Sequence, residues 1–241
     1  MNEASFIYWG DNNMAYQKSI VTENRKNEKQ KLIFDTAAKV FSEKGYNATS
    51  VKDITIEADI SVGTFYLYFK NKEDLFEQLY DEMAKILAAA EDYAINKTTC
   101  SVAEKFSRAI ASCLWAYQRH RKLARILMIE AVGLNPRFEQ KRAEITRKLC
   151  EQMEELFKML MEKGFISIPD PKIAALAYEG SYNVVNYSLQ QNDEKTDFTK
   201  HAYALAVYNL QALKIEFEHD KVTQYIKYIL QELNQGALNT I

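Results

Sequence analysis

The sequence is poor in the residues that make tight turns and cross-links. Its 241 residues include only seven glycines, three prolines and three cysteines. So few glycines and prolines leave little material for the turns of an all-β fold, whereas residues that favour helices are abundant. The cysteines are odd in number and form no CxxC pair, which argues against a disulfide framework and a zinc site. We therefore expect an all-α protein with reduced cysteines, and with neither a metal nor a cofactor.

An excess of one charge and long apolar runs are also missing. Lysine and arginine number 31 against 33 aspartates and glutamates, so any binding to nucleic acid must come from a local basic patch. No apolar run approaches the ~20 residues that cross a bilayer, and the first residues, MNEASFIYWGDNN, lack the basic start of a secretory signal. These absences predict a cytoplasmic protein without a membrane partner. Met14 is an alternative start of translation, which would remove the residues before it.

The sequence also lacks the common signatures of catalysis. Its three histidines, His120, His201 and His219, lie far apart in the chain. No HExxH, GxSxG or glycine-rich phosphate loop is present. The sequence therefore does not predict an enzyme.

What the chain does contain is a run of short helix signals near its start. Apolar residues recur at spacings of three and four between Asn24 and Lys44, which predicts an amphipathic helix. Thr49 or Ser50 can cap a second, short helix. Ser61 can begin a third, and the aspartate before it, Asp59, tolerates the left-handed backbone of a turn. Two short helices behind a longer one predict a helix-turn-helix unit over residues 24–75, preceded by a disordered arm, residues 1–23.

The third helix of this unit is ambiguous by composition. Residues 61–75 read SVGTFYLYFKNKEDL, and the core TFYLYF is typical of a strand. On a helix, however, Phe65 and Phe69 share one face that can be buried, and the other side chains are displayed. Hydroxyl groups on Thr64 and Tyr66 could then donate to phosphate oxygens. Only two acidic residues, Glu23 and Glu28, lie between residues 17 and 31. The cations in this stretch form a local basic patch: Lys18, Arg25, Lys26, Lys29 and Lys31.

The order of these motifs resembles the DNA-binding domain of TetR-family transcriptional regulators. The resemblance covers KLIFDTAAKVFSEKGYNA and TSVKDITIEADISVGTFYLYFKNKEDL, about a fifth of the chain. It implies that Thr49 caps the second helix and touches the DNA backbone. From its position at the start of the third helix, we expect Ser61 to add to the specificity of DNA binding. The resemblance implies that phosphates are contacted by Thr64, Tyr66, Tyr68 and Lys72. It also implies that the surface facing the major groove consists of Val62, Gly63 and Leu67. Two residues depart from the family pattern, Thr55 for alanine and Asp59 for glycine.

Residues 76–241 are predicted to form a larger helical bundle that binds an effector and dimerises. Asn135 with Pro136 and Asp170 with Pro171 each pair an N-cap with a proline at the first helical position, which begins a helix. The segment PKIAALAYEGSYNVVNYSLQ carries more apolar surface than one neighbour can cover, so it is a candidate dimer interface or a helix buried within one protomer. The residues assigned to the interface are Ile173, Ala177, Gly180, Val184, Tyr187, Ala202, Leu205 and Asn209.

The bundle is also rich in aromatic and flexible apolar side chains, which can be packing core or the lining of an effector cavity. The family resemblance implies such a cavity, and a lining of Met, Tyr and Trp suits an apolar or aromatic molecule. The candidate effector-binding residues are Met83, Cys113, Trp115, Tyr117, Met128, Met153, Phe157, Tyr178, Tyr182 and Asn186.

The resemblance implies a function as well as a fold. It suggests a ligand-responsive transcriptional regulator, a repressor that binds a palindromic double-stranded DNA operator as a homodimer and is released by a small-molecule effector. The alternative is a DNA-bound architectural or division-control protein that uses the same domain without a small-molecule effector. Val62 and Leu67 are apolar, so direct reading of bases would favour thymine methyl groups.

Overall fold

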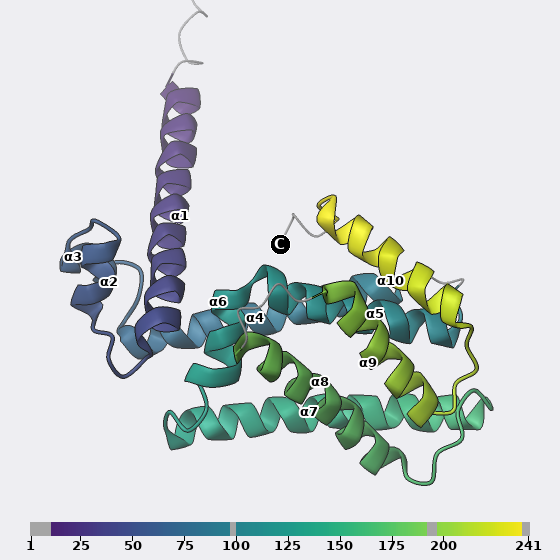
Figure 1. Cartoon of the computed structure of the whole chain (residues 1–241). Helices are drawn as coiled ribbons and strands as arrows, with labels where there is room; N and C mark the ends of the chain where they lie inside the picture. Colours follow the sequence, from purple (N-terminus) through teal and green to yellow (C-terminus); the bar gives the residue numbers. More distant parts are fainter. Residues whose placement is uncertain (1–10, 97–99, 192–196, 238–241) are drawn as a thin grey trace, which may run out of the picture. The chain divides into compact units, whose positions relative to one another are not determined.

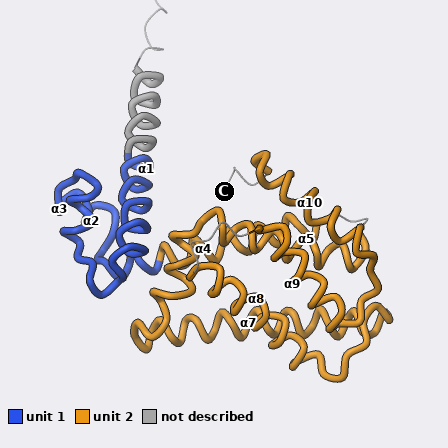
Figure 2. Tube along the Cα trace, in the orientation of Figure 1, with its two compact units in different colours: residues 1–77 blue, residues 78–241 orange. Residues whose placement is uncertain are grey.

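The computed structural model describes residues 11–96, 100–191 and 197–237, with side chains described from Lys26 onward. These residues are helical and contain no strand, in agreement with the all-α prediction (Figure 1). The chain divides into unit 1, Met1–Glu77, and unit 2, Gln78–Ile241 (Figure 2). Across the described ranges, no helix combines the length and the apolar character that crossing a membrane requires.

Unit 1 contains three helices and the first turns of a fourth: α1 (Asp11–Lys44), α2 (Val51–Glu57), α3 (Val62–Tyr66) and the start of α4 (Lys72–Ile95). Phe65 and Phe69 are buried in its core, as their helical spacing predicts. Phe41 and Phe76 pack edge to face with ring centroids 5.3 Å apart. The core thus joins α1, α3 and α4 around aromatic side chains.

The start of α1 differs from the predicted disordered arm. Residues 11–23 belong to the helix, and residues 1–10 lie outside the described part of the chain. The sequence explains the extension, since no glycine or proline stands between Asp11 and Lys44 to interrupt a helix. The amphipathic pattern that begins near Asn24 marks where one face becomes buried, and it does not mark where the helix begins.

Asp59 and Thr55, the two departures from the family pattern, both fit the local structure of unit 1. Asp59 has a φ of 51°, so the left-handed turn before α3 is made without glycine. Thr55 is buried, and its hydroxyl donates to the carbonyl of Lys52 at 3.0 Å. Both departures from the family pattern are therefore accommodated locally.

Unit 2 holds the rest of α4 and α5 (Val102–Arg119), α6 (Arg121–Arg125), a π-helical turn (Ile126–Glu130), α7 (Pro136–Glu162), α8 (Pro171–Gln191), α9 (Phe198–Ala212) and α10 (His219–Asn234). Helix α5 packs against α9 and α10, while α7 packs along α8 (Figure 1). Asn135 caps α7 ahead of Pro136, as predicted. Helix α9 ends at Ala212, and Lys214, just beyond it, takes a left-handed backbone with a φ of 55°.

A buried cation ties three helices of unit 2 together. Arg108 of α5 is 2% exposed; its Nε donates to the carbonyl of Ala94 at 3.1 Å, and its Nη2 donates to Glu232 Oε2 at 2.9 Å. These partners lie on α4 and α10. Because a buried charge is costly unless it is paired, the arrangement fixes α10 against the bundle.

Candidate nucleic-acid interface

The beginning of α2 is capped by Ser50. The Ser50 hydroxyl accepts from the Asp53 amide at 3.1 Å, and the Ser50 amide donates to Asp53 Oδ2 at 2.8 Å, which completes a capping box. The two side chains also hydrogen-bond to each other. These hydrogen bonds from Ser50 lower the pKa of Asp53 to about 2. Of the two residues that the sequence offered as caps, Ser50 is the one that caps α2.

Thr49 has a different role from the one that the resemblance implied. Its side chain is buried, and Oγ1 donates to the carbonyl of Gly45 at 2.7 Å. The hydroxyl therefore supplies a hydrogen-bond donor to a carbonyl at the end of α1, and it does not cap α2. The buried hydroxyl is already used inside the protein, so it does not add to the exposed surface of this domain.

Helix α3 presents one buried edge and one exposed edge. Ser61 caps it by accepting from the Thr64 amide at 3.0 Å, and the two hydroxyls lie 2.8 Å apart. Phe65 anchors the buried edge. The opposite edge displays Leu67, 77% exposed, and Tyr66, 55% exposed.

The other residues assigned to DNA contact are also accessible on α3 and the turn after it. Val62 and Gly63 are exposed, and Thr64 and Tyr68 are partly exposed. The exposed edge of α3 therefore carries two apolar side chains, Val62 and Leu67, beside the hydroxyl groups of tyrosine and threonine. Such an edge can contact thymine methyl groups and phosphate oxygens. Ile56 of α2 is also exposed, which its sequence pattern did not single out.

Lys72 makes more contacts within the protein than its assigned role suggests. Its ammonium donates to the carbonyls of Tyr46 at 2.9 Å and Thr49 at 2.8 Å, and it lies 4.0 Å from the centroid of the Tyr46 ring. Partial burial lowers the pKa of Lys72. The side chain therefore holds the turn between α1 and α2 in place, and an ammonium has one further hydrogen to offer a phosphate.

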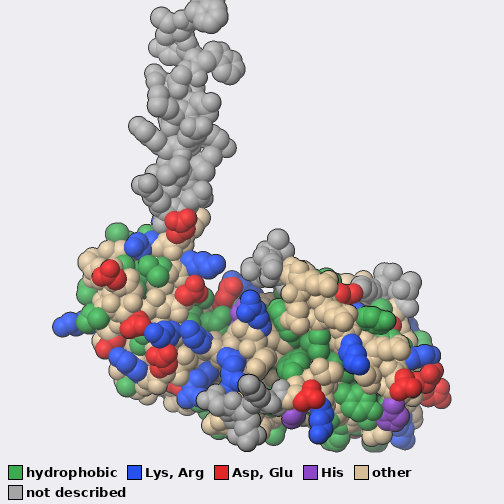
Figure 3. Space-filling view, turned by 45° about the horizontal axis from the view of Figure 1, so that its top comes forward, with side chains coloured by type: hydrophobic (Ala, Val, Ile, Leu, Met, Phe, Trp, Pro, Cys, Tyr) green, Lys and Arg blue, Asp and Glu red, His purple; other side chains and the backbone are tan. Residues whose placement is uncertain are grey.

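The basic patch predicted on the first helix lies only partly within the described side chains. Lys26 and Lys31 are exposed and Lys29 is partly exposed, whereas the side chains of Lys18 and Arg25 lie outside that description. Lysines and acidic residues alternate over the visible face of unit 1 (Figure 3). Two of the acidic groups are paired, Glu57 with Lys39 at 2.6 Å and Asp53 with Lys44 at 3.5 Å.

The residues assigned to an effector lie inside unit 2, in two apolar clusters. Cys113, Phe157, Tyr178 and Tyr182 are buried in the larger cluster, with Trp115 and Met153 packed at its edge. Met83 and Tyr117 are buried in the smaller one, with Met128 beside them. Asn186 is also buried. These positions are compatible with both interpretations of the sequence, packing core and cavity lining.

Two acidic residues near these clusters were missed by the sequence analysis. Glu91 of α4 and Glu179 of α8 are partly buried. Burial raises the pKa of Glu91, and burial together with the charge of Glu91 raises the pKa of Glu179 to about 7. No pattern in the sequence links these two residues, which come from helices far apart in the chain.

The residues assigned to a dimer interface divide into two sets. One set forms an exposed stripe on α8: Ile173 at 60% and Val184 at 70% exposure, with Ala177, Gly180 and Tyr187 also exposed. The other set, on α9, is buried within the protomer: Ala202, Leu205 and Asn209. These three side chains pack inward, because α9 buries that face against α5 and α10. On α9, the side chain of Tyr208 is 60% exposed, and it borders the same hollow as Ile173 and Ala177 of the α8 stripe.

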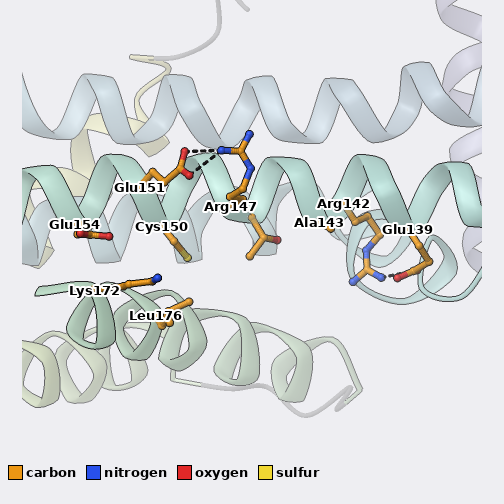
Figure 4. A pocket seen from close by; sticks show the side chains of 10 residues that line it. Glu139, Arg142, Ala143, Arg147, Cys150, Glu151, Glu154, Lys172 and Leu176 are labelled. Atoms are coloured by element: carbon orange, nitrogen blue, oxygen red, sulfur yellow. Dashed lines mark hydrogen bonds and ion pairs between the residues drawn. The ribbon is translucent and has the colours of Figure 1, made fainter. Parts of the chain in front are cut away.

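Two hollows border α8. One, of about 230 Å³, lies beside the exposed stripe and includes Ile173, Ala177 and Tyr208. The other, of about 620 Å³, lies between α7 and α8 and is open to solvent (Figure 4). Arg147 pairs with Glu151 along its α7 wall at 2.7 Å. The first hollow is lined mostly by apolar residues. In the second, Arg142 and Arg147 are paired with acidic residues of α7, and Lys172 comes from α8.

Comparisons with known proteins agree on one family. The family model for bacterial regulatory proteins of the tetR family matches residues 33–79. A 48-residue stretch is 58% identical to the uncharacterized HTH-type transcriptional regulator YuxN of Bacillus subtilis, and it spans only 20% of this chain and 16% of that protein. A longer match, 28% identical over 175 residues, covers 72% of this chain and 89% of the fatty acid metabolism regulator protein of the same organism.

A solved structure resembles most of the chain. The transcriptional regulator FadR from Bacillus subtilis, in complex with stearoyl-CoA, superposes with a TM-score of 0.64 at 24% identity. The match covers 75% of this chain and 97% of that one. These relatives are transcriptional regulators, and the architecture of both units is the one they share.

Proposed function

We propose that the chain is a TetR-family transcriptional regulator, a cytoplasmic repressor that binds a palindromic operator as a homodimer. A small effector bound in unit 2 releases it. The match of the tetR family model to residues 33–79 supports the family. The observation that carries the proposal is the exposed edge of α3, with Tyr66 and Leu67 outside and Phe65 buried. This helix is short, and Ser61 caps its N-terminus.

The chemistry of this edge supports tight but moderately selective binding. Tyr66, Tyr68 and Thr64 bring hydroxyls that can donate to phosphates in any sequence. Val62 and Leu67 offer only apolar contact, which favours thymine methyl groups over bidentate hydrogen bonding. One such helix reads few base pairs, so useful specificity requires a second copy related by two-fold symmetry.

The stripe on α8 supports that symmetry. Five of its residues are exposed and recur at helical spacing: Ile173, Ala177, Gly180, Val184 and Tyr187. Surface-exposed apolar stripes of this kind mark interaction sites, and Gly180 has no atom of the protomer within 4 Å of an added Cβ. We assign the stripe, with Tyr208 and the hollow beside it, to the contact between two copies, in place of the buried Ala202, Leu205 and Asn209.

The effector would act by shifting a population of conformations. Helix α4 begins in unit 1 and continues into unit 2 as a single helix. An effector that favours one arrangement of α4 in unit 2 would alter the spacing of the two α3 helices in the dimer, so that they no longer fit successive major grooves. DNA and effector would then weaken each other's binding by linkage.

The relatives do not fix the effector of this chain. One is named for fatty acid metabolism, and another holds stearoyl-CoA. An identity of 24% carries the fold alone, so the class of effector has to come from this chain's own side chains. An apolar or aromatic body is supported by the clusters around Tyr178 and Met83. Without any effector, the chain would instead be a DNA-bound architectural or division-control protein.

Selection of bound fragments from a random DNA pool tests the proposal. We expect an enriched pseudo-palindrome whose half-sites are rich in A·T pairs, with their centres about one helical turn or a multiple of it apart. Enrichment of an asymmetric site would contradict dimeric binding. A rise in melting temperature with an added effector, together with loss of the selected DNA, separates a regulator from a purely architectural protein.

A further inference from the structure

The exposed face of α8 has a symmetric distribution of side-chain sizes. Its central residue, Gly180, is exposed, and a Cβ added there meets no described atom of the protomer within 4 Å. Seven residues away on either side lie Ile173, 60% exposed, and Tyr187, 47% exposed. Four residues away lie Leu176, 47% exposed, and Val184, 70% exposed. The face therefore has a small centre and bulky apolar ends.

These five residues share one stripe of the helix. A spacing of three, four or seven residues returns a side chain to nearly the same side of an α-helix. Tyr178 and Tyr182, which lie between them in sequence, point the other way and are buried. Large apolar side chains that remain exposed along one stripe mark an interaction surface. Whatever covers this surface must approach Gly180 closely and must contact apolar groups on both sides of it.

A hollow adjoins the Ile173 end of the stripe. It has a volume of about 230 Å³, and its lining includes Ile173 and Ala177 of α8 and Tyr208 and Ala212 of α9. The opposite end of the stripe carries an exposed aromatic side chain, Tyr187. The two ends are separated by fourteen residues of α8, or ~21 Å at 1.5 Å per residue. Tyr187 therefore cannot reach the hollow of its own protomer.

A two-fold axis would bring the aromatic end of one copy to the hollow of another. In an isologous interface, a residue i that contacts j is matched by j contacting i. If the axis passes beside Gly180 at a right angle to α8, the two helices run antiparallel. A residue seven positions after Gly180 then faces the residue seven positions before it, so the partner's Tyr187 faces Ile173. By the same rule, Leu176 faces the partner's Val184. At the axis, glycine faces glycine, which allows the two backbones to approach closely.

On the premise of the proposed homodimer, we propose that two α8 helices cross antiparallel at Gly180 and that the partner's Tyr187 fills the hollow beside Ile173. The occupant of this surface is a second copy of the chain, which supplies the aromatic side chain twice, once at each end of the interface. A small ligand or an unrelated protein has no need of a stripe with bulky ends placed evenly about its centre, whereas a second copy requires it. An aromatic ring in a concave apolar site is the kind of contact that dominates the affinity of an interface.

Cysteine cross-linking tests the register of the two helices. Gly180→Cys in the full-length protein should form a covalent dimer on mild oxidation, because a disulfide needs Cα atoms within about 7 Å. The disulfide traps even a weakened dimer. Val184→Cys, on the same exposed stripe, is the matched control. In the antiparallel arrangement its two copies are ~12 Å apart along the helix, so they should not cross-link.

The wild-type protein, with its three native cysteines, sets the background of this experiment. Equal cross-linking at positions 180 and 184 would indicate parallel helices and overturn the proposal. Absence of cross-linking in Gly180→Cys above that background would also overturn it.

A double-mutant cycle tests what fills the hollow. Tyr187→Ala should weaken the dimer by at least about tenfold in sedimentation over a concentration series. Ala212→Phe places a ring in the hollow from its own wall and should also weaken the dimer, because the partner's Tyr187 no longer fits. The double variant should bind at least about tenfold more tightly than the product of the two single effects predicts, because the filled hollow then faces alanine. Additive effects would contradict the assignment of Tyr187 to the hollow.

Two further readouts separate this role from a general loss of structure. Tyr228→Ala, at an exposed tyrosine of α10 (58%), should leave the dimer constant unchanged. Tyr187→Ala should lower the affinity for the selected palindrome and leave the affinity for a single half-site unchanged. An equal loss on both duplexes would mean that the variant damages the protomer, and the role of Tyr187 at the interface would be withdrawn.

The outcomes distinguish this inference from the proposed function. If two chains bind the palindrome but Tyr187→Ala leaves the dimer constant unchanged, the dimeric repressor stands and the arrangement at α8 fails. If the protein is monomeric both in solution and on the selected DNA, the dimeric repressor fails and the arrangement fails with it.

Discussion

The ammonium of Lys72 lies 4.0 Å from the centre of the Tyr46 ring and donates to the Tyr46 carbonyl at 2.9 Å. A residue assigned to phosphate contact therefore also fixes the turn before α2. The two roles are compatible, because a lysine held in place loses less conformational entropy when it meets a phosphate. They also predict that one substitution will affect both folding and DNA binding.

Lys72→Ala should lower the stability of unit 1 by about 1–2 kcal/mol, because two carbonyls lose a charged donor. It should also weaken DNA binding and reduce the slope of log affinity against log salt by about one unit, which corresponds to one phosphate contact. Thermal unfolding and salt titration on the selected DNA measure the two effects. Lys70→Ala, at the exposed neighbour, is the control for stability and should leave unfolding unchanged. If the salt slope of Lys72→Ala stays at the wild-type value, Lys72 serves only the fold.

Tyr66 should contribute to DNA binding without contributing to folding. Its ring is 55% exposed at the edge of α3. Tyr66→Ala should weaken binding to all sequences by about tenfold, as expected for a phosphate contact, and should leave the melting temperature within about 1 °C. Tyr228→Ala, at an equally exposed tyrosine of α10 (58%), is the matched control. A loss confined to one operator sequence would instead indicate direct reading of bases.

The capping box of α2 should make part of the stability depend on pH. The pKa of Asp53 is lowered from an ordinary value of 3.8 to about 2, chiefly by hydrogen bonds from Ser50. A lowered folded-state pKa means that the stabilisation is complete above pH 4 and is lost as the pH falls through 2. Asp53→Asn should therefore lower the melting temperature at pH 7, and the difference from wild type should shrink below pH 4. A difference that is constant down to pH 2 would contradict the capping role of the carboxylate.

Substitution of Gly180 should have opposite effects on the stability of one protomer and on the affinity between two protomers. A methyl group at this position meets no atom of the protomer within 4 Å. Gly180→Ala should therefore stabilise the protomer by about 0.5–1 kcal/mol through helix propensity, and it should weaken the dimer where two α8 helices approach closely. Sedimentation across a concentration series measures the dimer. Gln231→Ala, on the exposed face of α10, is the control, and an unchanged dimer constant in Gly180→Ala would remove α8 from the interface.

Local signals in the sequence were sufficient for much of unit 1. The capping residues Ser50 and Ser61 and the left-handed turn at Asp59 lie where their side-chain chemistry predicts. These features depend on contacts within about four residues, which a single sequence displays. Thr49 and Lys72 were harder to assign, because their partners, Gly45 and Tyr46, depend on how α1 ends and α4 returns to it.

The interior of unit 2 was less predictable for a physical reason. The aromatic content indicated a core but could not assign partners, because residues that meet in the core come from helices far apart in sequence, such as Phe106 of α5 and Tyr178 of α8. Likewise, α8 and α9 are both apolar on more than one face. Only their packing against α5 and α10 shows that Leu205 is buried while Val184 remains exposed.

The central claim is that two copies of this chain hold one operator, and the mass of the complex tests it most directly. The selected palindromic duplex and a duplex carrying one half-site should be titrated separately, with the mass of each complex measured by light scattering. We predict two chains on the palindrome and an affinity for the single half-site that is at least about a hundredfold lower. One chain bound to a half-site as tightly as to the whole palindrome would contradict the account.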